Sequence, residues 1–459
     1  MIESIYLSLL FLFPGTIILT LISTNFKFKY LLGPFTSFAY FNFLSILFFI
    51  FNLGAFKFWF YVFALLPIFL IFKVKNKNEL FKNYLIMNIG FIVLNTLLNY
   101  FSLISLPGNT YHTFDELYKV FYLGTSNMDI GLIPLPMFTA GLFTNYDFDY
   151  SLINIFFIQF VFTALFSIFN YVKNKKELLI CLIFLFSNLM IFEVFYELIT
   201  YRSHSLSASA LMILFVSFHR FKNSDPEMLI LFFTIFILFN SRLENVLFGY
   251  LYIFIFKLLN PDKFESSKNL ILFSSFLAGL YLVVTLRTLP EDDIRSNPLF
   301  ILFFVILGLI FVYKSFFNDK FIFITSLLFV TIYSLIFYLN NKEIFRSVIS
   351  VVYTKLLDPN SGFGLQFLVI ICIFLYLSTE AETIPSSFIN YFLFVLVLTV
   401  LIGILQTNIF VPDTTVDSLE NKSIFNPLDL SIFRSLTQTL AVFWLFFTAA
   451  VLEKKDLSR

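Results

Sequence analysis

The feature that most constrains this chain is a series of apolar runs, each about twenty residues long, that recurs throughout its 459 residues. A helix of that length crosses the hydrocarbon core of a bilayer, which is about 30 Å thick. Charged residues make up only 13% of the sequence, against 59% hydrophobic residues. The pattern therefore predicts an all-α, polytopic transmembrane helical bundle.

The predicted crossings number about fifteen. The run 226–259 is interpreted as a hairpin of two crossings broken at 240–245, because one straight helix of that length would reach about 50 Å. The predicted crossings are 5–24, 33–51, 56–72, 84–105, 151–171, 178–196, 205–219, 226–240, 243–259, 270–287, 298–313, 321–339, 365–379, 387–405 and 431–452. The polar pieces between them include the loops 340–364 and 406–430, and Pro359-Asn360-Ser361-Gly362 has ordinary turn chemistry.

Lysine and arginine are divided unevenly between alternate loops, and this division predicts the orientation. Lys27, Lys29 and the lysines at 73–82 lie in loops on one side, whereas the loop 106–150 carries five acidic residues and only one lysine. The basic loops and the C-terminus are therefore expected in the cytoplasm, and the acidic loop outside. The expected location is a plasma membrane of the bacterial inner-membrane type, with membrane lipids as partners.

Several functional classes are disfavoured. A formal charge of +1 argues against a nucleic-acid partner, and the two cysteines lie inside apolar runs, where they behave as small hydrophobes. The sequence has no glycine-rich phosphate loop, CxxC pair or nucleophile elbow. No cofactor is identified; a divalent metal is left open, because carboxylates with His112 or His204 lack a ligand-spacing signature.

The longest polar interruption, Tyr111 to Phe143, opens with an acidic pair, Asp115 and Glu116. The run DELYKVFYLG predicts a short interfacial helix that carries one apolar stripe, with Tyr118 and Lys119 on other faces. Glycines and the Pro134-Leu135-Pro136 break then return the chain to the membrane. Carboxylates on such a shelf can meet a lipid-borne substrate from water; the alternative is an ordinary solvated loop.

Other ionisable residues are expected at the outer ends of crossings, namely Glu193, Glu197, Arg202, His204, Arg242 and Glu244. A charge at the bilayer centre costs about 2.5–3.5 kcal/mol, so such groups usually face a cavity or a partner. For Glu197 an outer-surface ion pair with Arg202 is the simpler interpretation.

The outward acidic loop, with Asp115-Glu116, Tyr118, Gly124 and a proline-led return, resembles the first catalytic loop of GT-C superfamily glycosyltransferases. The segment FNSRLENVLFGYLYIF resembles the Arg-x-Glu segment of their protein-mannosyltransferase-like branch, although Leu243 and Asn245 replace its usual proline and glycine. Four crossings precede the acidic loop here, where the family usually has one. The resemblance covers roughly 111–260 and rests on short motifs.

The resemblance implies inverting transfer of a sugar from a polyprenyl-phosphate donor to a lipid, glycan or protein acceptor. Asp115 would be the base, with Glu116 as second choice or metal ligand. Arg242 and Arg202, with His204 as a lesser option, would bind the donor phosphate, supported by Glu244, Glu193, Tyr118 and Lys119. The chain then divides into an N-terminal bundle (1–105), an outer loop of catalytic type (106–150), core crossings (151–260) and C-terminal crossings (261–459).

Two alternatives remain open. A transporter or flippase of lipid-linked glycans would line its path with buried charges, but the ionisable groups here gather at one face and no paired interrupted helices are found. A polysaccharide polymerase or ligase would instead present arginines to lipid-linked chains, and Arg346 and Lys355 in the loop 340–364 would then matter more than Asp115. A purely structural membrane scaffold does not account for this clustering of charge.

Overall fold

The structure is a computed structural model. It describes residues 13–26, 28–50, 57–100, 163–167, 169, 172, 175–191, 208–214, 225–241, 253, 261–286, 328, 331–332, 335–336, 338–339 and 342–380. These residues form helices and turns, with no strand among them, so the predicted all-α class is confirmed for this part of the chain. The chain divides into two compact units: unit 1 (Met1–Asn170 and Ile199–Lys314) and unit 2 (Tyr171–Leu198 and Ser315–Arg459).

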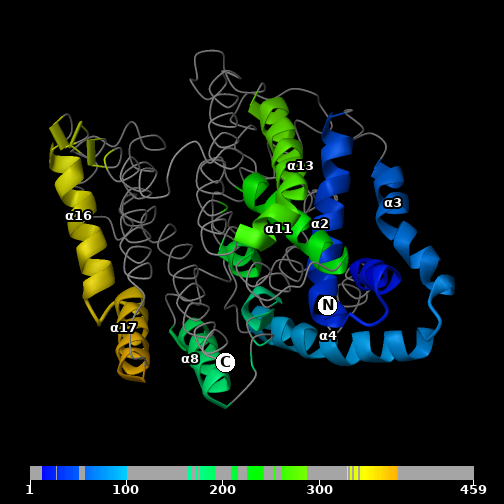
Figure 1. Cartoon of the computed structure of the whole chain (residues 1–459), viewed down its shortest axis with the longest axis horizontal. Helices are drawn as coiled ribbons and strands as arrows, with labels where there is room; N and C mark the ends of the chain where they lie inside the picture. Colours follow the sequence, from blue (N-terminus) through cyan, green and yellow to red (C-terminus); the bar gives the residue numbers. More distant parts are fainter. Residues whose placement is uncertain are drawn as a thin grey trace. The chain divides into compact units, whose positions relative to one another are not determined.

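Most of the described helices, labelled in Figure 1, coincide with apolar runs of the sequence. Within the described part of the chain, none of them combines the length and the apolar character that a membrane crossing requires. In unit 1 they are α2 (Lys29–Ile50), α3 (Lys57–Phe69), the 3-10 helix η2 (Leu70–Lys73), α4 (Lys77–Tyr100), α11 (Asp225–Ser241) and α13 (Pro261–Leu286). In unit 2 they are α8 (Lys175–Met190), α16 (Lys342–Leu357) and α17 (Gly362–Glu380).

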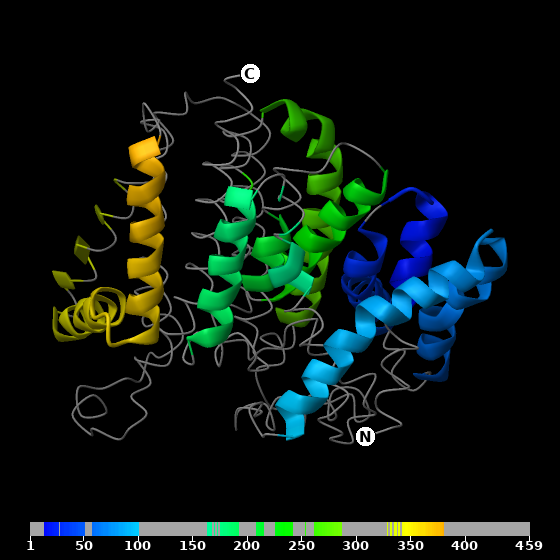
Figure 2. The same ribbon diagram turned by 90° about the horizontal axis from the view of Figure 1, so that it is seen from below.

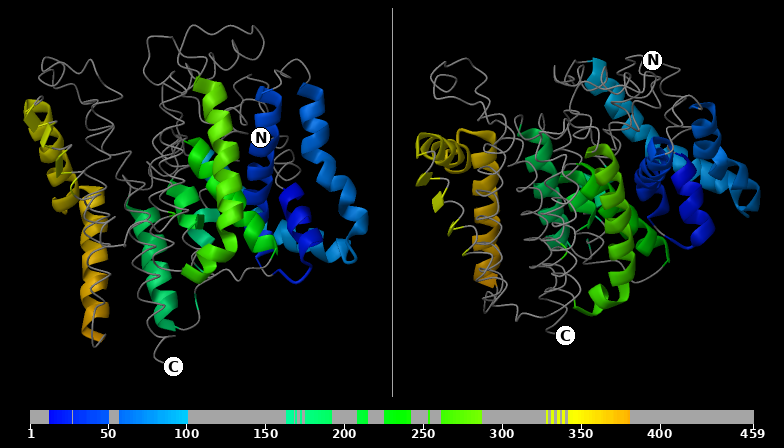
Figure 3. Two further views of the ribbon diagram at one scale, coloured as in Figure 1. Left: turned by 45° about the horizontal axis from the view of Figure 1, so that its top comes forward. Right: turned by 90° about the horizontal axis from the view of Figure 1, so that it is seen from above.

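The core of unit 1 is built around α11. Every residue from 230 to 240 is buried, as expected for a helix that is apolar on all sides. Phe232 packs against Phe273 of α13 with ring centroids 5.9 Å apart, and the Ser274 hydroxyl donates to the Phe232 carbonyl oxygen at 2.8 Å. Phe43 of α2 lies 6.0 Å from Phe236 on the same helix. The helices α2 and α13 therefore both pack against α11 through aromatic side chains, with α13 beside α2 (Figures 1 and 3).

The helical segment 13–22 crosses α2 at very short range. The Gly15 amide donates to the Ser37 hydroxyl at 2.7 Å. A Cβ atom on Gly15 would overlap the Gly33 carbonyl oxygen and the Ser37 backbone nitrogen, and one on Gly33 would overlap Thr16. Only glycine lets the two backbones approach this closely, so this crossing depends on residues without side chains.

Many exposed side chains of α3, η2 and α4 are large and apolar, although Lys73, Lys77, Glu79 and Lys82 are exposed there too. Val74 and Leu80 are buried and fix the turn between η2 and α4, while large side chains on either side of it are exposed. They include Phe58, Trp59, Phe63, Leu66, Phe69, Phe72, Phe81, Ile86, Ile89 and Val93. An apolar surface of this extent is unusual for a helix pair in water.

In unit 2, α8 packs against α17 through buried amides: the Gln366 Nε2 donates to the Asn188 Oδ1 at 3.1 Å. The segment 340–364, predicted as a loop, instead contains the sixteen-residue helix α16. Its apolar positions are interrupted by charges, so it has no continuous run of the kind that marks a crossing. The predicted turn at 359–362 is confirmed: the Asn360 amide donates to the Asp358 Oδ1, and the Gly364 amide to the Ser361 hydroxyl, each at 2.9 Å.

Candidate functional site

The residues that the sequence assigns to catalysis and donor binding lie outside the described residues. They are Asp115, Glu116, Tyr118, Lys119, Glu193, Arg202, His204, Arg242 and Glu244. Their roles and their proximity to one another therefore stay predictions. The described structure instead locates the helix that leads to Arg242, and a cavity that the sequence did not indicate.

The helix α11 ends at Ser241, directly before Arg242. The Asn240 side chain is buried, and its Nδ2 donates to the Phe236 carbonyl oxygen at 2.9 Å. Its Oδ1 atom is also buried and, among the residues that the structure describes, has no hydrogen-bond partner. A buried acceptor without a partner lowers the stability of the fold by about 1–3 kcal/mol. A donor that reaches the C-terminal end of α11 would therefore gain a hydrogen bond to Asn240. Sequence reasoning placed a break at 240–245 but gave Asn240 no role.

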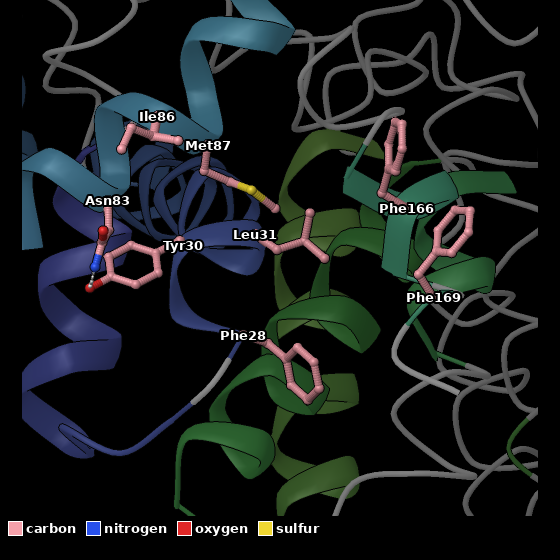
Figure 4. A pocket seen from close by; sticks show the side chains of 8 residues that line it. All are labelled: Phe28, Tyr30, Leu31, Asn83, Ile86, Met87, Phe166 and Phe169. Carbon is pink, nitrogen blue, oxygen red and sulfur yellow. Dashed lines mark hydrogen bonds between the residues drawn. The ribbon is translucent and has the colours of Figure 1, made fainter. Parts of the chain in front are cut away.

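A cavity of about 410 Å³ opens in unit 1 where α2 begins (Figure 4). Three elements supply its walls, and most of the lining side chains are apolar. The lining residues are Phe28, Tyr30, Leu31, Asn83, Ile86, Met87, Phe166 and Phe169. In Figure 4 Met87 points toward Leu31, while Phe166 and Phe169 close the opposite side.

The polar end of the cavity is formed by Tyr30 and Asn83, whose Nδ2 donates to the Tyr30 hydroxyl at 3.3 Å. The Lys29 ammonium lies 5.3 Å from the centroid of the Tyr30 ring and donates to the Thr24 carbonyl oxygen at 2.7 Å. Partial burial lowers the pKa of Lys29, and the negative charge of Glu79 opposes that shift.

The composition of these walls defines what the cavity can do. None of its eight lining residues is a carboxylate, a histidine or a thiol. It can therefore hold an apolar group with a polar tip, and among its lining residues only the Tyr30 hydroxyl could take part in proton transfer. No local sequence pattern predicts this cavity, because Tyr30 and Asn83 are separated by 53 positions.

The described residues contain no cluster of three or more histidine, cysteine, aspartate or glutamate side chains able to hold a metal ion. Cys181 is buried and Cys372 is exposed, and neither of these two cysteines forms a disulfide. No protein-family model matches the chain, and neither curated proteins nor solved structures include a significant match.

Proposed function

We propose that this chain is an integral-membrane glycosyltransferase that moves a sugar from a polyprenyl-phosphate donor to a lipid, glycan or protein acceptor at the outer face of the membrane. The observation that carries the proposal is the acidic loop at 111–143, which the distribution of lysine and arginine places outside in a chain built of apolar runs. The resemblance to GT-C glycosyltransferases rests on this loop and on the Arg242-x-Glu244 segment.

The proposed chemistry needs few groups. In an inverting transfer Asp115 takes the proton of the acceptor hydroxyl as that oxygen attacks the anomeric carbon, and the lipid phosphate leaves with the electron pair of the broken bond. The planar guanidinium groups of Arg242 and Arg202 suit two oxygens of the departing phosphate. The donor is carried by the membrane, which fits a sequence without a nucleotide-binding motif.

Two features of the described helices support a membrane location. The exposed aromatic and aliphatic side chains of α3 and α4 suit an apolar solvent. The crossing at Gly15, Gly33 and Ser37 uses small residues, as membrane helices do, because lipid supplies no hydrophobic drive for helix association. Two buried hydroxyls nearby bond within their own helices: Thr20 and Thr36 donate to the carbonyl oxygens of Thr16 and Leu32 at 2.7 and 2.8 Å.

The decisive experiment is a sugar-transfer assay on membranes that contain the full-length chain, with a lipid extract as the source of donor and acceptor. Asp115→Asn keeps the size of the side chain but removes the base, so transfer should fall by about 10²-fold or more at unchanged protein abundance. Asp147→Asn in the same outer loop is the matched control and should be nearly neutral. Equal and mild effects at the two positions would show that the loop is merely solvated.

A second candidate is a polysaccharide polymerase or ligase, and one observation favours it. In a polymerase or ligase of this kind, the segment 340–364 would contact the substrate. This segment contains the helix α16, and the Arg346 side chain on it is exposed. The variant Arg346→Gln distinguishes the polymerase or ligase from the glycosyltransferase that uses Asp115. Loss of transfer in this variant, with activity retained in Asp115→Asn, would favour the polymerase or ligase.

A further inference from the structure

The helix α16 leaves one of its faces uncovered, and that face changes character along its length. Lys342, Glu343 and Arg346 are exposed in its first half. In the second half Ile349, Tyr353 and Leu357 follow at intervals of four and are 39%, 65% and 55% exposed. Residues four apart lie on one side of a helix, so the cationic end and the apolar end belong to a single surface.

The position of α16 is fixed by its connection to α17. Figure 1 shows α16 lengthwise, whereas Figure 2 shows α17 lengthwise with α16 nearly end-on, so α16 runs across α17 and does not continue it. The Asp358 carbonyl oxygen accepts from the backbone amide of Ser361 at 3.0 Å and from its hydroxyl at 2.9 Å. A Cβ atom on Gly364 would overlap this same oxygen, so the close turn requires glycine there.

The segment before α16 extends the apolar surface. The Tyr338 ring packs edge-on against Phe345, with centroids 5.4 Å apart, and the Lys342 ammonium lies 5.7 Å from the Tyr338 centroid. These contacts join the segment to the first turn of α16. Its own exposed side chains are between 52% and 70% exposed, namely Leu328, Ile332, Leu335, Ile336 and Leu339.

The chemistry of this surface matches the boundary of an anionic bilayer. Long basic side chains place their methylenes along apolar surface while their charges reach lipid phosphates, and tyrosine favours the same depth. Each basic residue near an anionic surface contributes about 1 kcal/mol of attraction. A helix that binds a membrane in this way needs an apolar surface on one side only, not an apolar run twenty residues long.

We propose that α16 is a membrane-interface helix. Lys342 and Arg346 lie at the phosphates of anionic lipids, and Ile349, Tyr353 and Leu357 lie progressively deeper among the acyl chains. The inference rests on the membrane location in the proposed function, but not on the transfer chemistry.

The test is a depth measurement on the full-length chain reconstituted in vesicles of phosphatidylcholine and phosphatidylglycerol. Cys372→Ala removes the exposed thiol, while Cys181 is fully buried and is expected not to react. Single variants Glu343→Cys, Ile349→Cys, Tyr353→Cys and Leu357→Cys then carry a spin label. All four native side chains are exposed, so the replacements should leave the fold intact. Collision rates with oxygen and with a water-soluble nickel chelate report depth.

The expected result is a label at position 343 that the nickel chelate reaches, and labels at 349, 353 and 357 that favour oxygen increasingly in that order. Chelate access at all four positions would overturn the proposal, because the helix would then lie in water. Protection from both reagents at 349–357 would also overturn it, since a second copy or another protein would then cover the face. In the double variant Lys342→Gln/Arg346→Gln the labels should become shallower only in vesicles that contain phosphatidylglycerol. If their depth in those vesicles is unchanged, Lys342 and Arg346 do not bind anionic lipids.

Failure of this inference can be distinguished from failure of the proposed function. If alkaline carbonate releases the chain from membranes, the integral location in the proposed function is wrong, whatever the labels report. If the chain stays in the membrane and transfers sugar through Asp115 while the labels at 349–357 report water, only the interface helix is wrong.

Discussion

The crossing between the segment 13–22 and α2 allows a prediction with a matched control. In Gly15→Ala the new methyl group would meet the Gly33 carbonyl oxygen, the Ser37 nitrogen and the Thr36 carbonyl carbon. All three are backbone atoms, so none of them can rotate away as the end of a side chain would. The two helices must therefore move apart, and the fold must lose stability.

The magnitude follows from three contributions. Overpacking a well-filled contact costs about 1–3 kcal/mol. Separating the helices also weakens the bond from the Gly15 amide to the Ser37 hydroxyl, which contributes about 0.5–1.5 kcal/mol. Alanine favours a helix over glycine by about 0.5–1 kcal/mol, which offsets part of this loss. The net destabilisation should be about 2 kcal/mol.

The control is Gly90→Ala on α4. A Cβ atom there would have no other atom within 4 Å, so only the helix preference remains. Thermal unfolding of the purified full-length chain, followed by intrinsic fluorescence, should show a lower Tm for Gly15→Ala and an unchanged or slightly higher Tm for Gly90→Ala. If the two variants unfold at the same temperature, the reasoning from close backbone contact is refuted.

Two further predictions concern the buried amides of unit 2 and the proposed phosphate ligand. Among the described contacts, Asn188→Leu leaves both polar atoms of the Gln366 amide without a partner, so this variant should lower the stability of the fold more than Gln366→Leu does. In a double-mutant cycle the two residues should couple by about 1 kcal/mol. Purely additive losses of stability would contradict the contact. Arg242→Lys keeps the charge but loses the two-pronged guanidinium, so the KM for the lipid donor should rise about tenfold or more at constant abundance; full transfer activity in this variant would remove Arg242 from the site.

The sequence predicts most of the described helices because a long apolar run admits few structures. The runs 33–51, 226–240 and 365–379 correspond to α2, α11 and α17 with boundaries within a few residues. The same criterion missed α16, whose apolar residues occupy one stripe broken by charges. The apolar run also predicted a start of α13 at 270, whereas the helix begins at Pro261. Proline suits the first helical position, but the residues that follow Pro261 are mostly polar and do not belong to an apolar run.

Contacts between residues far apart in the sequence cannot be predicted from apolar runs. The Tyr30–Asn83 bond, the Gly15–Ser37 bond and the Gln366–Asn188 bond each depend on how two helices cross, and apolar periodicity carries no information about crossing partners. The candidate catalytic residues were chosen by charge and by family resemblance alone. Their assignment therefore depends on the transfer assay.

Buried hydroxyls and buried amides are satisfied in different ways, and the difference bears on the proposed site. A hydroxyl such as that of Thr234 is satisfied by the carbonyl oxygen four residues earlier in its own helix, so it does not require a neighbouring helix. An amide has more hydrogen-bonding atoms than one helix can satisfy, and Asn188 resolves this by pairing with Gln366 on α17. Within the described part of the chain, Asn240 is satisfied only through its nitrogen, at the end of the buried stretch 230–240 of α11. Side chains two positions apart do not face each other on a continuous helix, so Arg242 can donate to Asn240 only if the helix is broken after Ser241, as the sequence predicts. The break predicted at 240–245 and the unsatisfied Oδ1 atom of Asn240 thus fall in the same short segment of the chain.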